Sequence, residues 1–406
     1  MVAIPIPNTP HPTPLGEDPV SWLRLIRSRR VGAVSFHRLV GEHGSVAAAL
    51  AALPGIAAAA GLDHYAACPE GVARAEIAAA RRKGAVMLRY GGPDYPPALL
   101  DLPDAPPILW AQGDLALLHR PAIALIGARN ASSLGLRMTR RLAEGLGWAS
   151  QGAVSGMEET SPPPGFVIVS GLARGIDAEA HRAALDTGTI AVVAGGIDVV
   201  YPPENLSLSQ DIARRGCLLS EQPMGIEPRA HHFPARNRIV SGLSQAVVVV
   251  EAAARSGSLI TARMALDQGR EVLAVPGHPL DLRAAGCNQL IRDGAVLVQG
   301  PGDVIAALGG YRAPPPRAGG TVSSAPIGAA PVPHCPTPPN PAAQAAGDSS
   351  LLGRLLNRLG PSPVAEDQLI RDLQAPAAVL ASLILTLEIE GQVERQPGGM
   401  ISRCSI

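Results

Sequence analysis

The spacing of apolar residues changes in character along the chain and divides it into parts. Between Pro19 and about Ala80, apolar residues recur at helical spacing, and Gly32, Gly44 and Gly55 separate the runs. This pattern predicts a small helical domain of short helices, spanning residues 17–85. Its predicted apolar face consists of Trp22, Leu23, Ile26, Phe36, Leu39, Val40, Val46, Leu50 and Leu53.

From residue 121 onward, the apolar residues form short continuous runs, each followed by a glycine-containing turn and a helical pattern. A strand covered on both faces is apolar throughout, and strands that alternate with helices form a parallel sheet through right-handed crossovers. Residues 121–311 are therefore predicted to form an α/β domain with a doubly wound parallel sheet. The predicted strands are residues 122–126, 166–169, 190–193, 217–219, 246–250, 272–275 and 295–298.

Three further segments are predicted to be connections. Residues 1–16 contain five prolines, which predicts a disordered arm. Residues 86–120 are also rich in proline and are predicted to be a connecting segment that contains a short strand at 108–110. Residues 312–349 consist largely of Pro, Ala and Gly and have almost no large apolar side chains, which predicts a linker.

The tail, residues 350–406, again has the pattern of a folded domain. Apolar residues at helical spacing predict three helices, at about 351–356, 364–373 and 378–390. Residues 391–403 are typical of a two-stranded hairpin with two glycines in its turn. Three helices followed by a hairpin are the elements of a winged-helix domain.

The charge of the chain is balanced, with 34 basic and 34 acidic residues. This balance argues against nucleic-acid binding over the whole surface, but it is compatible with a local basic cleft. Only one basic residue, Lys83, is a lysine, so abundance of arginine is a bias of the whole chain. Aromatic residues make up 3% of the chain, which is few for a protein that stacks on many bases.

The five cysteines lie far apart, without a C-x-x-C pair. This spacing excludes the usual zinc ribbon and the disulfide scaffold of a small secreted domain, and we expect neither a metal nor a cofactor. The first twenty residues lack the pattern of a signal peptide. The small-apolar stretch 47–62 is interrupted by Pro54 and Gly55, so no membrane segment is expected. We therefore expect a cytoplasmic protein.

Candidate chemistry lies in the loops that follow the predicted strands, because ligands of doubly wound sheets bind at the carboxyl ends of the strands. In the first loop, residues 127–135, Gly127 allows close approach of an anion, and Ser132 or Ser133 can cap the next helix. The loop does not have the G-x-G-x-x-G pattern, so a dinucleotide is disfavoured. A tight structural turn is the alternative.

The second loop, residues 170–177, combines two glycines with Arg174 at a helix start, as a phosphate cradle requires. Asp177 is expected to cap the helix or, alternatively, to tie down Arg174. His181 has no nearby nucleophile and no second histidine at metal spacing, so a structural role is favoured over catalysis. In the third loop, 195–205, Gly195 permits close approach, and Tyr201 either stacks on a base or plugs the sheet edge.

The fourth segment, residues 231–238, is predicted to be an extended segment that precedes a strand. It places Phe233, Asn237 and two arginine side chains close together, and arginine forks match phosphate oxygens while an aromatic ring can stack on a base. A fifth turn, within residues 251–261, offers donors at Ser256, Gly257 and Ser258. Five such turns along one sheet edge favour a nucleic-acid backbone over a single small metabolite. No carboxylate pair, Ser/His/Asp set or metal cluster indicates catalysis.

Several long motifs in order resemble the DprA/Smf family of DNA-processing proteins: residues 169–177, 199–205, 233–244, 256–262 and 269–277. The resemblance covers about residues 121–305. It implies a Rossmann-like fold and a homodimer. It also implies a single-stranded DNA-binding protein of natural transformation that protects incoming DNA and loads the RecA recombinase, without being an enzyme.

The motifs carry several predicted contacts onto this chain. By resemblance, Arg129, Arg174, Arg236 and Arg238 are the basic contacts, and backbone or hydroxyl donors come from Gly127, Ser170, Gly171 and Gly175. The complete set of predicted DNA-binding residues is Gly127, Arg129, Ser170, Gly171, Arg174, Gly175, Gly195, Phe233, Arg236, Asn237, Arg238, Ser256, Gly257 and Ser258.

The chain departs from the family pattern in three places. Residues 127–129 are Gly-Ala-Arg where Gly-Ser-Arg is common, which removes a hydroxyl donor. Arg174 stands where many relatives have lysine, which keeps the charge but changes the contact geometry. Residues 148–165 resemble an insertion and are expected to form a mobile acidic loop.

Two other functions compete with this hypothesis. One is a nucleotide-processing enzyme of the lysine-decarboxylase-like group, but its P-G-G-x-G-T motif corresponds here to Pro-Gly-His-Pro at 276–279. The other makes the winged helix a reader of duplex DNA and the α/β domain a dimerisation scaffold. Acidic residues outnumber basic ones in that tail, so a role in protein contacts is at least as well supported.

Overall fold

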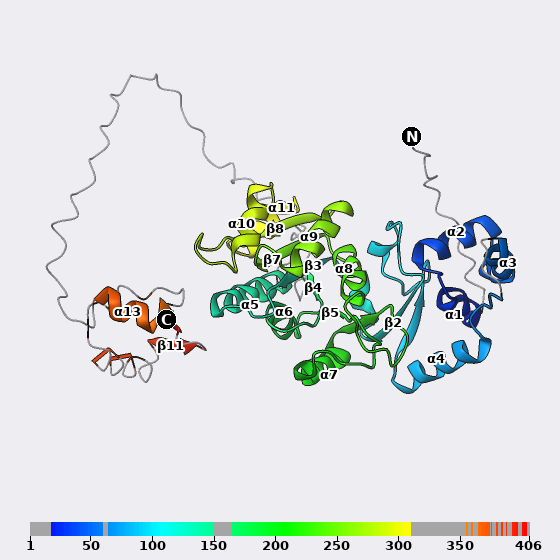
Figure 1. Cartoon of the computed structure of the whole chain (residues 1–406), viewed down its shortest axis with the longest axis horizontal. Helices are drawn as coiled ribbons and strands as arrows, with labels where there is room; N and C mark the ends of the chain where they lie inside the picture. Colours follow the sequence, from blue (N-terminus) through cyan, green and yellow to red (C-terminus); the bar gives the residue numbers. More distant parts are fainter. Residues whose placement is uncertain are drawn as a thin grey trace, which may run out of the picture. The chain divides into compact units, whose positions relative to one another are not determined.

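The computed structural model describes residues 18–59, 64–148 and 165–309, together with parts of the chain between 355 and 403 (Figure 1). The chain divides into two compact units, Met1–Ala313 and Pro314–Ile406. The predicted arm at 1–16, the predicted linker at 312–349 and nearly all of the insertion at 148–165 lie outside the described residues.

The first unit begins with the predicted helical part. It consists of α1 (Pro19–Arg27), α2 (Ala33–His43), α3 (Val46–Ala59) and α4 (Glu70–Arg82), and α1 packs against the other three helices. All predicted apolar residues of this part are buried or half-buried. Gly44 ends α2 in the left-handed conformation with a φ of 77°, where glycine is favoured.

Gly55 does not end a helix, so that part of the prediction was wrong. Pro54 and Gly55 both lie inside α3, whose Leu53 and Ala57 are buried on one face. Packing of that face stabilises the helix despite two residues of poor helix propensity.

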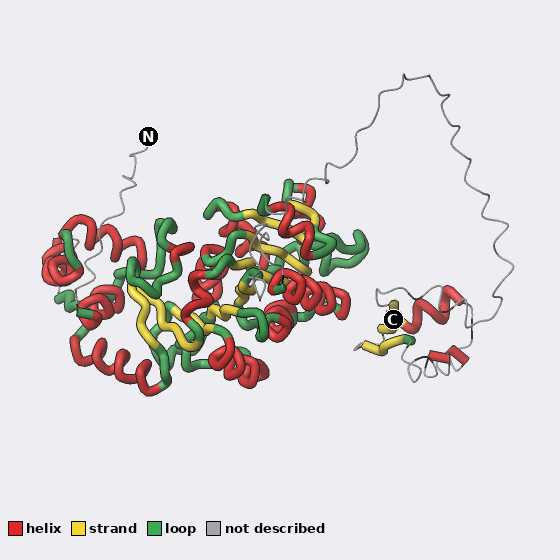
Figure 2. The backbone as a smooth tube through the Cα atoms, turned by 180° about the vertical axis from the view of Figure 1, so that it is seen from behind, coloured by secondary structure: helices red, strands yellow, loops and turns green. Residues whose placement is uncertain are grey.

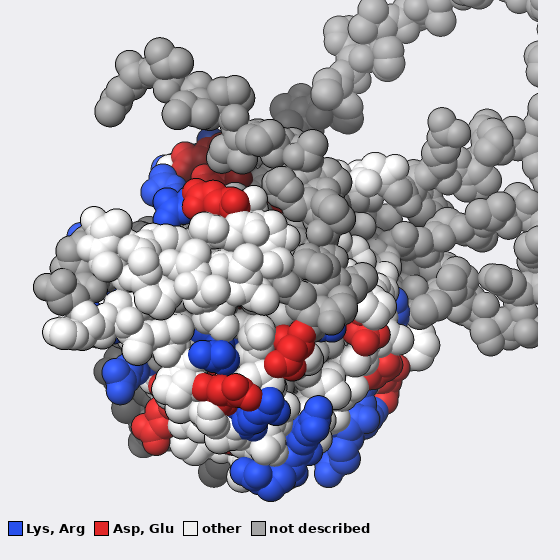
Figure 3. Space-filling model, turned by 90° about the vertical axis from the view of Figure 1, so that its right-hand side faces the viewer, with Lys and Arg blue, Asp and Glu red and all other residues white. Residues whose placement is uncertain are grey.

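Figure 3 shows both signs of charge around a broad uncharged area at this end of the molecule, and α3 contributes no charged residue to it.

A nine-stranded sheet forms the centre of the first unit, in the order β1-β2-β6-β5-β4-β3-β7-β8-β9. The seven strands β3 to β9 are parallel to one another and match the seven predicted strands to within two residues. The strands are β1 (Val86–Arg89), β2 (Ile108–Gly113), β3 (Ala122–Gly127), β4 (Val167–Ser170), β5 (Thr189–Val192), β6 (Cys217–Ser220), β7 (Ala246–Glu251), β8 (Glu271–Ala274) and β9 (Val296–Leu297).

Residues 86–120 are more than a connection, because they add β1 and β2 to the sheet. β2 pairs antiparallel with β6, so that Trp110 lies opposite Ser220, and β1 pairs antiparallel with β2. Ile108, Leu109 and Trp110 are almost fully buried. The sheet therefore continues past the parallel strands into an antiparallel edge, which is common in doubly wound folds.

Helices cover both faces of the sheet (Figure 2). Alternate residues of β3 point to opposite faces: Ala124 packs with α8, α9 and α10, whereas Ile123 packs with α5, α6 and α11. α7 packs under β2, β5 and β6. These helices are α5 (Ser133–Gly147), α6 (Ile176–Ala183), α7 (Leu206–Arg215), α8 (His232–Gly242), α9 (Gly257–Asp267), α10 (Ala285–Arg292) and α11 (Pro301–Ala307).

The second unit contains a small antiparallel sheet and an apolar core. β10 (Val364–Ala365), β12 (Met400–Arg403) and β11 (Val393–Gln396) form the sheet, and α13 (Glu366–Leu373) follows β10 directly. The β11–β12 hairpin confirms the predicted one. Most residues of the other two predicted helices lie outside the described residues, although Leu355, Leu380 and Ile384 belong to the buried core.

Of the described helices, none is by itself both long and apolar enough to cross a membrane; α2 and α3 meet that test only as a pair, bent by 105°. The described cysteines, Cys68, Cys217 and Cys287, are free and buried.

Candidate functional site

Loops at the carboxyl ends of the parallel strands enclose two adjoining hollows. The first, of about 260 Å³, lies between the loops that follow β3, β4 and β5 and the segment that leads into α8. The second, of about 830 Å³, lies between the loops that follow β3 and β4, α8 and the start of α9. Arg129, Gly171, Ala173 and Phe233 line both hollows. We call the two hollows together the groove.

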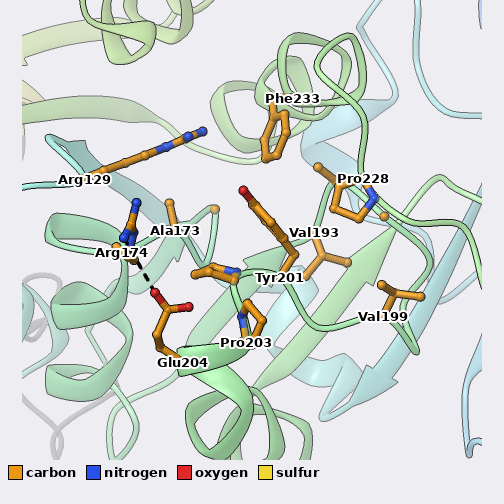
Figure 4. A pocket seen from close by; sticks show the side chains of 14 residues that line it. Arg129, Ala173, Arg174, Val193, Val199, Tyr201, Pro203, Glu204, Pro228 and Phe233 are labelled. Carbon is orange, nitrogen blue, oxygen red and sulfur yellow. Dashed lines mark ion pairs between the residues drawn. The ribbon is translucent and has the colours of Figure 1, made fainter.

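Aromatic rings and an arginine meet where the two hollows adjoin. The rings of Tyr201 and Phe233 are 5.9 Å apart and inclined by 59°, and the Arg129 guanidinium lies 5.2 Å from the centre of the Phe233 ring. Figure 4 shows Arg129 extended toward Phe233, with Tyr201 facing the same space. Tyr201 is 50% exposed, so it does not plug the sheet edge.

Five arginines line the groove, Arg129, Arg174, Arg236, Arg255 and Arg283, and the sequence analysis did not single out the last two. Arg129 and Arg174 are exposed as predicted, and Arg174 lies 3.7 Å from the carboxylate of Glu204. Arg255 and Arg283 line the second hollow. Arg255 directly precedes Ser256 in the turn after β7, which could have identified it, whereas no local signal marks Arg283.

Arg283 is held in place by acidic neighbours. It lies 3.1 Å from Asp281 and 4.0 Å from Glu251. Its hydrogen bonds to Asp281 lower the pKa of that carboxyl group below its usual value. The charge of Arg283 is therefore partly neutralised within the protein.

The predicted serine cap of the first loop is present, and a second cap, at Ser256, was not predicted. Ser132, rather than Ser133, caps α5: its hydroxyl accepts a hydrogen bond from Gly135 N at 3.0 Å and donates one to Glu251. Ser256 caps α9, and the hydroxyl of Ser258 donates to Gly127 O at 3.0 Å. These hydroxyls hold the loops against each other.

The fourth segment is the helix α8 and not an extended strand approach, so this prediction was wrong. Phe233, Arg236, Asn237 and Val240 follow the i, i+3, i+4, i+7 spacing of one helix face, and all four line the second hollow. Arg238 lies two positions further round the helix than Arg236 and consequently points elsewhere.

Three predicted contact residues are bound within the protein, and two of them, Ser170 and Arg236, are buried. Ser170 is fully buried and donates to Leu125 O at 2.6 Å. Arg238 has a side chain only 13% exposed, 2.7 Å from Glu221 and 3.4 Å from Asp104. Arg236 is 7% exposed and donates to Gly171 O and Val192 O. The structure therefore keeps Ser170 and Arg238 out of the groove, and it holds Arg236, which lines the second hollow, against backbone carbonyls.

Asp177 plays neither of its predicted roles. Its Oδ2 accepts hydrogen bonds from Gly171 N and Ala173 N, in the preceding loop, and Arg174 pairs with Glu204 instead. Burial raises the pKa of Asp177 above its usual value, against the opposing effect of Arg236.

His181 is a structural residue. It is fully buried, with Nε2 accepting from Leu172 N at 3.3 Å and Nδ1 lying 2.7 Å from Thr189 Oγ1. Burial, followed by the nearby charges of Arg236 and Arg182, lowers the pKa of His181 to about 3. The imidazole is therefore neutral at pH 7 and serves as a hydrogen-bond acceptor.

The glycines of these loops allow the loops to pack against one another. A Cβ at Gly127 would lie 2.6 Å from Ile176, and one at Gly195 would lie 2.7 Å from Ile226 O. Gly175 has a φ of 71° and would place a Cβ 2.3 Å from Ala128 O. A tight structural turn was the alternative interpretation of the first loop. The glycines of the second and third loops also serve close packing, so this interpretation applies to them as well.

The structure brings most predicted residues to the groove. Ser170, Gly175 and Arg238 line neither hollow. Across the described parts of the chain, no three or more His, Cys, Asp or Glu side chains form a group that could hold a metal ion. The predicted residues that line the groove are Gly127, Arg129, Gly171, Arg174, Gly195, Phe233, Arg236, Asn237, Ser256, Gly257 and Ser258.

Three family models match the chain. The model of DNA recombination-mediator protein A matches residues 86–309, which is more than half of the chain. The model of the DprA-like N-terminal HHH domain matches residues 16–79. The model of the DprA winged helix domain matches residues 338–399.

Individual relatives agree with the family models. Protein Smf of Synechocystis is 34% identical over 78% of this chain and 80% of its own. DNA processing protein DprA of Streptococcus pneumoniae is 44% identical over 52% of this chain and 70% of its own. The X-ray structure of DprA from Streptococcus pneumoniae covers 59% of this chain and 77% of its own, with 39% identity and a TM-score of 0.52. The chain belongs to the DprA/Smf family, whose central domain is that of DNA recombination-mediator protein A.

Proposed function

We propose that this protein binds single-stranded DNA in the groove and acts as a recombination mediator in natural transformation. In this role it protects incoming strands and delivers them to a RecA recombinase. The observation that carries the proposal is the meeting of Arg129, Phe233 and Tyr201 where the two hollows adjoin. A guanidinium beside partly exposed rings provides a phosphate partner and a stacking surface at one place.

The exposed rings favour a single strand over a duplex. In a duplex the faces of the bases are covered by their neighbours, whereas unpaired bases can stack on aromatic side chains. Stacking also tolerates any base, because every base has a π face. Binding without sequence preference is therefore expected.

The phosphates are assigned to the arginines that line the groove. Arg129 and Arg174 carry over from the family motifs, and the position of Arg255 in the second hollow adds a third. The first residues of α9, beside Gly257, line the same hollow, and the amino end of a helix suits an anion. We assign no direct contact to Ser170, Arg236 or Arg238, because the side chain of each is bound within the protein.

An apolar surface supports the proposed homodimer. Leu280 and Leu282 are 85% and 81% exposed, and Ile260 and Leu266 on α9 are 48% and 59% exposed. Ile260 and Leu266 line a hollow of about 1000 Å³ between α9 and α10. Pro279, which directly precedes Leu280, lines the same hollow. Exposed apolar residues mark interaction surfaces in soluble proteins where they form a patch, and a second copy of the chain is the partner we propose.

We infer that the protein is not an enzyme. Glu251 lies at the end of β7, and its carboxylate accepts hydrogen bonds from the hydroxyl and the amide of Ser132. It is therefore not a free catalytic base. His181 is buried and neutral. The nucleotide-processing alternative therefore has no observation in its favour.

The proposal is tested by fluorescence anisotropy of a labelled oligothymidylate. Replacing Arg129 and Arg174 together by alanine should weaken binding at least tenfold, which corresponds to about 1.4 kcal/mol, and should reduce its salt dependence. The matched control replaces Arg214 and Arg215, which end α7 before the amino end of β6, opposite the groove. Equal affinity of the unaltered chain and the groove double variant would refute the proposal.

A further inference from the structure

Residues 171–173, in the loop after β4, have an unusual backbone environment. Leu172 is fully buried with a φ of 55°, in the left-handed region that residues with a side chain rarely adopt. Such a conformation costs of order 1 kcal/mol and persists only where surrounding contacts hold it. Gly171 and Ala173, on either side of Leu172, line both hollows of the groove.

Four side chains supply these contacts, and we call them the loop clamp: Asp177, His181, Asn205 and Arg236. They come from α6, from the turn before α7 and from α8. None is more than 7% exposed.

The clamp binds every amide and every carbonyl of residues 171–173. The amides of Gly171 and Ala173 donate to Asp177 at 3.1 and 3.4 Å, and the amide of Leu172 donates to His181 at 3.3 Å.

The carbonyls are bound in the same way. The amide group of Asn205 donates to the carbonyls of Leu172 and Ala173 at 3.0 and 3.2 Å. Arg236 donates to the remaining carbonyl, that of Gly171. The six polar groups of this short loop are thus bound by side chains rather than by regular secondary structure.

The geometry of Arg236 separates it from the arginines that can reach a phosphate. Its Nη1 bridges Gly171 O and Val192 O, and its Nε donates to Asn237. Burial lowers the pKa of Arg236 to about 10, and the charge of Asp177 acts in the opposite direction. With Asp177 as a nearby counter-charge, Arg236 adds little to the attraction of a polyanion to the groove.

We propose that the four residues of the loop clamp are positioning residues for DNA binding. They hold residues 171–173 in the conformation that forms the wall between the two hollows and that presents Arg174, without touching the DNA themselves. This inference rests on the proposed function, because it assigns a role within the same groove.

The test compares Arg236→Lys with Arg129→Ala in the full chain. Lysine keeps the charge of Arg236 but has only one donor atom, so it cannot reproduce both the Nη1 bridge to two carbonyls and the Nε hydrogen bond to Asn237. Hydrogen exchange of residues 171–173, followed by mass spectrometry, should become at least tenfold faster in Arg236→Lys and remain unchanged in Arg129→Ala.

Affinity for oligothymidylate is measured over a range of salt concentrations. Arg236→Lys should weaken binding at least fivefold while the slope of log K against log salt stays at the value of the unaltered chain. Arg129→Ala should reduce that slope by about 0.7, the value for one phosphate contact on a single strand. Because Arg236→Lys keeps the charge, hydrogen exchange of residues 171–173 is the readout that separates a positioning residue from a contact residue, and the slope checks that the number of phosphate contacts is unchanged.

Asn205→Ala repeats the test without changing any charge and covers the case in which Arg236→Lys does not fold. It should show the same faster exchange and the same loss of affinity at unchanged slope.

The inference is overturned if exchange is unchanged, if affinity is unchanged while exchange is faster, or if Arg236→Lys lowers the slope as Arg129→Ala does. Absence of DNA binding by the unaltered chain would instead refute the proposed function, and the two failures are therefore distinguishable.

Discussion

The guanidinium of Arg129 lies over the ring of Phe233, 5.2 Å from its centre, although the two residues are more than a hundred positions apart. Arg129 comes from the loop after β3 and Phe233 from the first turn of α8. A cation over an aromatic face is an attractive arrangement, which orients the arginine side chain across the groove. The pair therefore brings together the two functions of the proposed site, a guanidinium that binds phosphate and a ring on which a base stacks.

Phe233→Ala should weaken binding of oligothymidylate by about 1–3 kcal/mol, because it removes a stacking surface for a base. The salt dependence of binding should change little, since no phosphate contact is lost. Anisotropy titrations at several salt concentrations measure both quantities. Tyr201→Phe is the control, because it keeps the neighbouring ring and removes only a hydroxyl. Full affinity in Phe233→Ala would show that this ring does not stack on DNA.

Glu204→Gln should strengthen DNA binding. The Glu204 carboxylate lies 3.7 Å from Arg174, and both side chains are more than half exposed. An exposed pair contributes only about 0–1 kcal/mol, so the expected gain is at most about fivefold.

The gain should be largest at low salt and should disappear at high salt, where the charge is screened. Glu42→Gln is the matched control, because Glu42 is similarly exposed and pairs with Arg38 on α2. A gain of equal size in both variants would contradict a specific role for Glu204.

His181 should make the stability of the first unit depend on pH. Burial lowers its pKa to about 3, from an ordinary value of 6.5. The unfolded chain therefore binds the proton more readily. The stabilisation is fully present above pH 6.5 and is lost as pH falls from 6.5 toward 3.

Between pH 7.5 and 5, this loss should amount to about 2 kcal/mol. His181→Gln, which can still accept the Leu172 amide, should be less stable at pH 7.5 but should lose less stability on acidification. Urea unfolding at pH 7.5 and pH 5 gives both values. His37→Gln serves as the comparison, because burial also lowers the pKa of His37, which lies outside the groove. Identical pH profiles of the unaltered chain and His181→Gln would contradict this prediction.

Replacing Leu280 and Leu282 together by serine should convert the proposed dimer into a monomer, because the two exposed side chains would no longer contribute apolar area to an interface. Sedimentation velocity measures the change as a halving of mass. Val34→Ser is the control, since Val34 is 60% exposed but lies on α2. If the double variant keeps the mass of the unaltered chain, the second copy does not bind at this surface.

Much of the central sheet could be predicted from the sequence, because parallel strands covered on both faces are apolar throughout. The pairing of β2 with β6 could not, since it joins Trp110 to Ser220 across more than a hundred residues. The helix α8 was missed because its Arg and Asn residues suggested a binding loop. Its helical signal lay in the spacing of Phe233, Arg236, Asn237 and Val240, which share one face.

The sequence by itself determined the residue types that the loops carry, the order of strands and helices, and the family to which their motifs belong. These properties depend on local periodicity and on short motifs. Tertiary structure alone decided which arginines are available to a ligand: Arg129 and Arg174 are exposed, whereas Arg236 is buried against carbonyls and Arg238 is paired with carboxylates. The physical reason is that a guanidinium is available to a ligand only if groups brought close by folding do not already satisfy it.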